Sequence, residues 1–176
     1  MAELHPDNPY APERFPDSSK KVEFPPEVKQ RFEEILTRYP TKQAALLPTL
    51  HLAQETWGWI SPETVLYVSE LLDQAPASVF GVVSFYNMFN QRPVGKYHLQ
   101  VCTNLSCMLR NAYDIYAHLC SKLGVHPGEN TPDGKFTVGE VECLGSCSTA
   151  PVVQVNNDYH EDQTIEKMDQ LLATLK

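Results

Sequence analysis

Two stretches in the second half of the chain are the most informative about its fold: YHLQVCTNLSCMLR at residues 97–110 and FTVGEVECLGSC at residues 136–147. Apolar residues alternate with polar ones over residues 97–102, which predicts a β-strand, and residues 136–142 are expected to form a second one. Each predicted strand ends in a loop with two cysteines, Cys102 and Cys107 in the first and Cys143 and Cys147 in the second. Because loops at the ends of neighbouring strands lie close together, the four thiols can meet at one place.

The residues around these loops complete a small α/β domain over residues 93–176. A helix is expected from Cys107 or Met108 to Leu123, followed by short strands at residues 152–155 and near residues 159–160. The residues from Ile165 onward have the spacing of a C-terminal amphipathic helix. The predicted buried stripe of the first helix is Met108, Ala112, Ile115, Leu119 and Leu123, and the amphipathic pattern of the last helix is formed by Ile165, Met168, Leu171, Leu172 and Leu175.

The first half, residues 26–92, predicts a bundle of about four helices, so the fold class is α+β. A first helix is expected to end at Pro40, and a second, over residues 42–57, to end at Gly58 with a kink or restart at Pro48. Ser61-Pro62-Glu63 is a helix-start signature, and Pro76 opens a very apolar fourth helix, SVFGVVSFYNMF. The predicted apolar face of the first helix contains Val28, Phe32, Ile35, Leu36 and Tyr39.

Residues 1–25 differ from the rest of the chain. They are rich in charge and poor in apolar residues, and prolines crowd this stretch at positions 6, 9, 12, 16 and 25, with another immediately after it at position 26. Such a composition favours an extended, flexible arm. A strap that lies over a partner subunit is the alternative.

The composition excludes several classes of function. Lys and Arg number 14 against 22 Asp and Glu, a net charge of −8, which is unsuited to phosphate backbones. No apolar run is long enough to span a membrane, and MAELHPDNPY lacks the pattern of a signal peptide. We therefore expect a cytoplasmic protein in a reducing compartment, where structural disulfides are rare. The cysteines then need another explanation, which metal binding can give.

The spacing within each cysteine pair bears on the kind of metal. Structural zinc prefers two residues between paired ligands, whereas four and three residues intervene here. Wider loops suit a two-iron cluster with one iron held by each pair. Gly145 lets the backbone approach the cluster sulfurs, and a helix starting near Cys107 offers further N–H groups. The spacing matches neither plant-type nor Rieske centres, nor a Cys-x-x-Cys dithiol. Zinc and a metal-free site remain open.

Other features are less specific. Cys120 lies among apolar residues of a predicted helix and is expected to pack in the core rather than bind metal. Residues 158–162, DYHED, form either a solvated turn or a docking contact. No nicotinamide, flavin or nucleophile motif is present, so we expect no complete active site in this chain and no catalytic residue of its own.

The same stretches resemble a known family. VCTNLSCMLR and VECLGSCSTAPVVQVNNDYHED closely resemble the 24-kDa subunits of respiratory complex I, the E subunits of the bacterial complexes, and LLPTLHLAQETWGWI and VFGVVSFYNMF resemble their helical half. The resemblance covers about residues 25–176. It implies a helical bundle followed by a thioredoxin-like ferredoxin domain. It also implies one [2Fe–2S] cluster, with Cys102 and Cys107 on one iron and Cys143 and Cys147 on the other.

The resemblance further implies a partner and a place in the cell. FMN and NADH are expected on a partner flavoprotein subunit, with which the cluster exchanges single electrons, while quinone is reduced elsewhere in the complex. The complex would hold this chain peripherally at the cytoplasmic face of the inner membrane. The alternatives are the equivalent diaphorase subunit of an NAD-linked hydrogenase or formate dehydrogenase, a free shuttle ferredoxin, and a zinc-stabilised interaction module. By analogy with thioredoxin-like folds, we also predict a cis peptide bond before Pro151.

Overall fold

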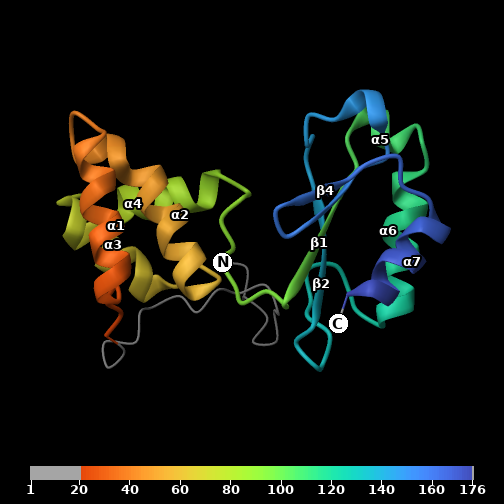
Figure 1. Cartoon of the computed structure of the whole chain (residues 1–176), viewed down its shortest axis with the longest axis horizontal. Helices are drawn as coiled ribbons and strands as arrows, with labels where there is room; N and C mark the ends of the chain where they lie inside the picture. The colour runs from red at the N-terminus through yellow and green to blue at the C-terminus, as the bar shows by residue number, and fades with distance from the viewer. Residues whose placement is uncertain (1–20, 176) are drawn as a thin grey trace, which may run out of the picture. The chain divides into compact units, whose positions relative to one another are not determined.

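The computed structural model describes residues 21–175, and most of the predicted Pro-rich arm, residues 1–20, lies outside this range. The chain divides into two compact units, one that ends at Pro93 and one that begins at Val94 (Figure 1). No helix within residues 21–175 is long and apolar enough to cross a membrane.

The first unit is helical, as predicted. Its helices are α1 (Pro26–Thr37), α2 (Leu46–Trp57), α3 (Pro62–Leu72) and α4 (Pro76–Phe85). A proline stands in the opening turn of α1, α3 and α4, where its missing N–H has no intrahelical partner to lose. Ser61 caps α3 by accepting a hydrogen bond from the Thr64 N–H at 3.1 Å, and Gly58 ends α2 in the left-handed conformation.

Three local expectations for this unit need correction. The restart expected at Pro48 occurs slightly earlier, where a 3₁₀ turn at Gln43–Ala45 gives way to α2 at Leu46. The fourth helix ends at Phe85, because Tyr86 adopts an extended conformation. Tyr39 lies beyond the end of α1 and is exposed, so it leaves the predicted apolar face.

The core of the helical unit joins α1 through α4. Phe24 stacks on Trp57 with 5.0 Å between ring centroids, and its N–H donates to the Tyr67 hydroxyl at 3.0 Å. The remaining core is aliphatic and includes Leu50, Ala53, Val68, Leu72 and Val79, each completely buried. Burial of this many apolar side chains accounts for the stability of a bundle of short helices.

The second unit contains one mixed sheet of four strands in the order β2-β1-β3-β4. The strands are β1 (Tyr97–Cys102), β2 (Phe136–Val141), β3 (Val153–Val155) and β4 (Asp158–His160). β1 pairs with β2 in parallel and with β3 antiparallel, and β3 pairs with β4 antiparallel. The mixed α+β fold agrees with the prediction.

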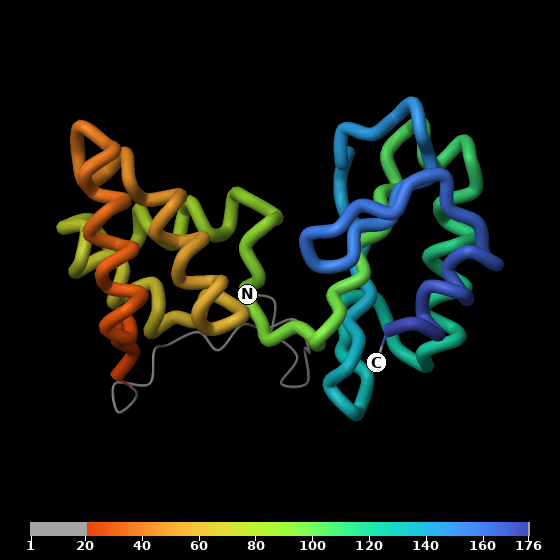
Figure 2. The backbone as a smooth tube through the Cα atoms, in the orientation of Figure 1, coloured from red at the N-terminus to blue at the C-terminus, as the bar shows by residue number. Residues whose placement is uncertain are grey.

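Helices α6 (Ala112–Leu123) and α7 (Ile165–Thr174) lie on the same side of this sheet (Figure 2). Parallel pairing of β1 and β2 requires a crossover, and α6 supplies it. The core between helices and sheet is fully buried, and its largest members are Leu99, Val101, Leu119, Val138, Val152 and Met168.

The helix expected from Cys107 or Met108 to Leu123 is broken in two. A separate short helix, α5, spans Leu105–Met108, and Asn111 takes the left-handed conformation before α6. Asparagine tolerates that conformation better than most residues, which permits the break. Met108 is therefore exposed rather than part of the buried stripe.

The predicted cis bond is confirmed, because the Ala150–Pro151 peptide is cis. It lies in the segment between a 3₁₀ turn, Cys147–Thr149, and β3.

Candidate functional site

The first cysteine pair is built into the core of the second unit. Cys102 is the last residue of β1, and its N–H donates to the Val152 carbonyl at 3.1 Å. Cys107 lies in α5, which Asn104 caps by accepting from the Leu105 N–H at 2.8 Å. Both cysteines are buried, with 2% and 3% of their surface exposed. A central strand and a capped turn thus fix this pair.

The second pair lies in an exposed loop that follows β2. The Sγ atoms of Cys143 and Cys147 are 3.6 Å apart, close to the roughly 3.8 Å that separates two thiolates on a tetrahedral metal with bonds of about 2.3 Å. Gly145 has φ +81°, and its N–H donates to the Cys143 Sγ at 3.4 Å. A glycine takes this conformation without steric cost, so its position explains how the loop turns both sulfurs together.

The strand register brings the two pairs to one end of the sheet. Cys102 is the partner of Val141 in the parallel β1–β2 ladder, so both cysteine loops leave the sheet at the same end. Their electrostatics agree with this arrangement. The pKa of Cys107 is raised to about 11, first by burial and then by a hydrogen bond with Cys102, and the charges of Cys102 and Cys147 contribute.

The pKa of Cys147, in the second pair, is also raised by neighbouring cysteines. A hydrogen bond with Cys143 raises the pKa of Cys147, Cys102 adds a charge effect, and a hydrogen bond from Ser106 in α5 opposes the rise. These thiols are close enough to disfavour one another's ionisation. A cation that replaces their protons relieves that repulsion, as metal binding does at thiolate sites.

The donor set consists of two thiol pairs. Among residues 21–175, no group of three or more His, Cys, Asp or Glu side chains could hold one metal ion. Two separate thiol pairs, with a backbone N–H directed at one sulfur, suit a dinuclear cluster with one pair for each iron.

Cys120 stands apart from this arrangement. It lies on α6, partly buried, and packs against the core of the second unit. Burial raises its pKa, and no other cysteine contributes to the shift. The structure therefore places it as a packing residue, as expected from the sequence.

Several side chains that support the cysteine loops are not evident from the sequence. Asn104 donates to the Glu142 carboxylate at 3.2 Å, and Thr103 donates to Glu140 at 2.6 Å. Tyr159 and Glu161 contact the second loop. No sequence signal identifies these residues, because each contact joins positions that only the sheet brings together.

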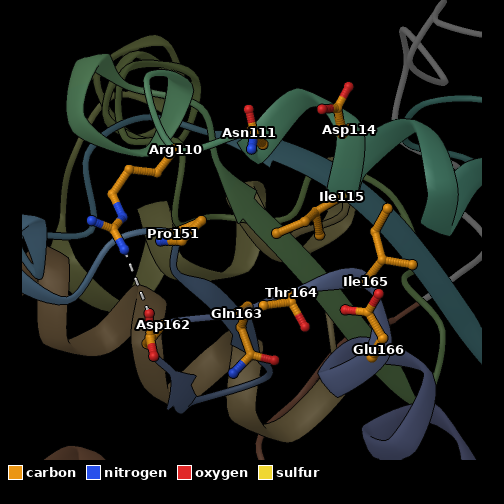
Figure 3. Close-up of a pocket in the computed structure, with 10 residues that line it drawn as sticks. All are labelled: Arg110, Asn111, Asp114, Ile115, Pro151, Asp162, Gln163, Thr164, Ile165 and Glu166. Atoms are coloured by element: carbon orange, nitrogen blue, oxygen red, sulfur yellow. Dashed lines mark ion pairs between the residues drawn. The ribbon is translucent and has the colours of Figure 1, made fainter.

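A cavity of about 460 Å³ lies beside Pro151, between the start of α6 and the start of α7 (Figure 3). Its lining includes three carboxylates, Asp114, Asp162 and Glu166, and none of the four cysteines. Arg110 faces Asp162 across it at 3.8 Å. We assign this cavity no function.

Comparison with known proteins identifies the class. The sequence pattern of the thioredoxin-like [2Fe–2S] ferredoxins matches residues 32–176, so the chain belongs to this family, whose members are defined by a [2Fe–2S] cluster. It is 47% identical over 152 residues to NADH-quinone oxidoreductase subunit 2 of Thermus thermophilus, a match that covers 84% of each chain. It is 46% identical over 143 residues to the E subunit of the NADH-quinone oxidoreductase of Rickettsia felis, covering 80% of this chain and 86% of the relative.

A solved structure supports the same fold. The NAD⁺-reducing [NiFe]-hydrogenase in its H₂-reduced state matches with a TM-score of 0.65 and 23% sequence identity. The match covers 74% of this chain but only 22% of the hydrogenase chain. At this identity the likeness concerns the fold alone.

Proposed function

We propose that this chain is the one-electron carrier subunit of the NADH dehydrogenase module of respiratory complex I, NADH:quinone oxidoreductase. Cys102 and Cys107 would hold one iron of a [2Fe–2S] cluster, and Cys143 and Cys147 the other. The single observation that carries the proposal is the convergence of the two thiol pairs at one end of β1 and β2. The identity of 46–47% to subunits of NADH-quinone oxidoreductases supports the assignment to this complex.

The two cysteine pairs and the Gly145 N–H would have different roles in holding the cluster. The buried pair would hold one iron, and the exposed pair would hold the other. The Gly145 N–H, directed at the Cys143 sulfur, would stabilise negative charge on that ligand. When bound, a [2Fe–2S] cluster accepts and returns one electron at a time.

Such a carrier needs a partner, because the sequence carries no nicotinamide or flavin motif with which to oxidise a substrate itself. The proposed partner is the flavoprotein subunit that binds FMN and NADH. Exposed apolar side chains on α5 and just after it, beside Cys107, offer a surface for that partner: Leu105, Met108 and Leu109. Within the complex, the chain would lie peripherally at the cytoplasmic face of the inner membrane.

The second candidate is the diaphorase subunit of an NAD-linked hydrogenase. The NAD⁺-reducing hydrogenase shares the fold of this chain, but its sequence identity is half of that of the NADH-quinone oxidoreductase subunit. The two candidates share the cluster and the flavin partner and differ in the rest of the assembly.

Iron and acid-labile sulfide analysis with EPR spectroscopy, on full-length protein purified without oxygen, tests the proposal. We expect two irons and two sulfides per chain and an EPR signal that appears only on reduction. Colourless protein that contains zinc, and that takes up no iron on reconstitution, would reject the electron-carrier function. Purification of the chain from its native host, followed by mass spectrometry of the bound subunits, separates complex I from a hydrogenase.

A further inference from the structure

The segment Tyr159–Asp162, which follows the β3–β4 turn, forms several hydrogen bonds with the loop of the second cysteine pair. The Tyr159 hydroxyl donates to the Leu144 carbonyl at 2.9 Å. The Thr149 hydroxyl donates to Oε1 of Glu161 at 2.7 Å, and the Ser146 hydroxyl donates to the same oxygen. The segment therefore contacts the loop at two positions between the cysteines, Leu144 and Ser146, and at Thr149 just after them.

Backbone hydrogen bonds add to these side-chain contacts. The Asp162 N–H donates to the Thr149 carbonyl at 2.7 Å, and the Thr149 N–H donates to the Ser146 carbonyl at 3.1 Å. The loop follows the last paired residue of β2, Val141, so the sheet ladder no longer holds it. Side chains from Tyr159–Asp162 take over that role, because β4 pairs with β3 and thereby reaches this end of the sheet.

Glu161 differs from the other groups that contact the loop because it brings a charge. Its two hydroxyl donors, Ser146 first and Thr149 second, hold the pKa of its carboxyl below the usual range. It is therefore a carboxylate at neutral pH, one hydrogen bond away from Ser146, the residue immediately before the ligand Cys147. A fixed negative charge beside the loop of the proposed ligands opposes the addition of an electron.

We propose that Glu161 is a positioning residue for the iron–sulfur site: its carboxylate, held by Ser146 and Thr149, fixes the Cys143–Cys147 loop for iron binding and keeps the reduction potential of the bound cluster low. This inference rests on the function proposed above. It assigns two separable effects to one side chain, geometry through the hydrogen bonds and potential through the charge.

Two substitutions separate these effects. Glu161→Gln keeps an acceptor oxygen for the hydroxyls and removes the charge, whereas Glu161→Ala removes both. The matched control is Glu129, a half-buried glutamate of the same unit, which accepts from the His126 N–H at 3.2 Å and lies near the start of β2, at the opposite end from Cys143. The controls are Glu129→Gln and Glu129→Ala.

The experiment uses the full chain with its cluster, purified without oxygen. The measurements are the rate of cluster loss to an iron chelator, the midpoint potential from an EPR-monitored titration, and the thermal unfolding of each apo-protein. We expect Glu161→Ala to lose the cluster about ten-fold faster than the wild type, at the low end of the effect of removing a group that supports a metal ligand. Glu161→Gln should keep the cluster at nearly the native rate but have a more positive midpoint potential. Both Glu129 variants should match the wild type.

The possible results distinguish a failure of the proposed role of Glu161 from a failure of the proposed electron-carrier function. Equal rates of cluster loss and equal potentials in the Glu161 and Glu129 variants would overturn the role of Glu161. If apo Glu161→Ala unfolds at a lower temperature but the variant retains its cluster and its midpoint potential like the wild type, Glu161 has a merely structural role. That result would also overturn the proposed role of Glu161 at the iron–sulfur site. An unshifted potential in Glu161→Gln would reject the charge effect. Wild-type protein without a [2Fe–2S] cluster would instead reject the proposed function itself.

Discussion

The two cysteine pairs occupy different environments although they lie at the same end of one sheet. Cys102 and Cys107 are buried in the core, and the sheet and a capped turn fix them. Cys143 and Cys147 are exposed in a loop that side chains from Tyr159–Asp162 hold. Two pairs of the same residue type are therefore held by unequal means, since one pair depends on the fold and the other on a few polar contacts.

The largest expected effect is loss of the cluster on removal of any one ligand. Cys143→Ser should abolish or severely weaken cluster binding, because a hydroxyl is a poor substitute for a soft thiolate. Iron and sulfide content after anaerobic purification checks this. Cys120→Ser is the matched control and should retain two irons per chain, since Cys120 only packs against the core. Bleaching by Cys120→Ser but not by Cys143→Ser would refute the proposed ligand set.

The contrast between the pairs becomes sharper in the apo-protein. Cys107→Ser places a hydroxyl at a site with 3% exposure and should lower the free energy of unfolding by about 1–3 kcal/mol, the usual cost of burying such a group. Cys147→Ser changes an exposed side chain and should stay within about 0.5 kcal/mol. Urea unfolding of both apo variants measures the difference. Equal destabilisation by the two would contradict the contrast between a fold-held and a loop-held pair.

A smaller effect is expected at the turn of the exposed loop. Gly145→Ala should cost about 1 kcal/mol or slightly more, because alanine at positive φ is strained, although its Cβ would meet no atom within 4 Å. Gly81, in α4, has equally open surroundings and no positive φ, so Gly81→Ala should be neutral or stabilising. Thermal unfolding of apo Gly145→Ala and apo Gly81→Ala measures the difference between the two substitutions. A neutral Gly145→Ala would mean that the loop adapts freely.

The smallest effect concerns a region that belongs to neither pair. Lys122 and His118, both on α6, each lie 2.7 Å from the carboxylate of Asp169 on α7. Their hydrogen bonds hold the pKa of the Asp169 carboxyl below its usual range. A carboxyl whose pKa is lower in the folded state than in the unfolded state stabilises the fold at pH values above its unfolded-state pKa. This stabilisation is lost as the pH falls through the folded-state pKa. The apo-protein should therefore lose stability below about pH 4, and Asp169→Asn should reduce that loss. Urea unfolding across this acidic range, compared with neutral pH, measures it, with Asp114→Asn as the control.

Much of the fold could be predicted from local patterns. The helical spacing of apolar residues, the proline starts of α1, α3 and α4, and the glycine end of α2 are all short-range signals, and they located the helices of the first unit. The alternation over residues 97–102 located β1. The failures are local as well: the break at Asn111 and the early end of α4 at Phe85 depend on single backbone conformations that no periodicity reveals.

The candidate ligands could be nominated from the sequence, whereas the residues that support their loops could not. The paired spacing of Cys102, Cys107, Cys143 and Cys147 was sufficient to nominate four ligands and to set Cys120 aside. The contacts of Tyr159 and Glu161 with the second loop could not be foreseen, because residues 158–162 were equally compatible with a solvated turn or a docking contact.

Residue type and spacing along the chain were enough to locate most helices and strands, to place the chain in its family and to nominate the four candidate ligands. Three other properties came only from the folded chain: the two thiol pairs share one end of the sheet, one pair is buried while the other is exposed, and Glu161 supports the exposed loop. The physical reason is that strand register and burial depend on contacts between residues distant in sequence, which no local pattern encodes.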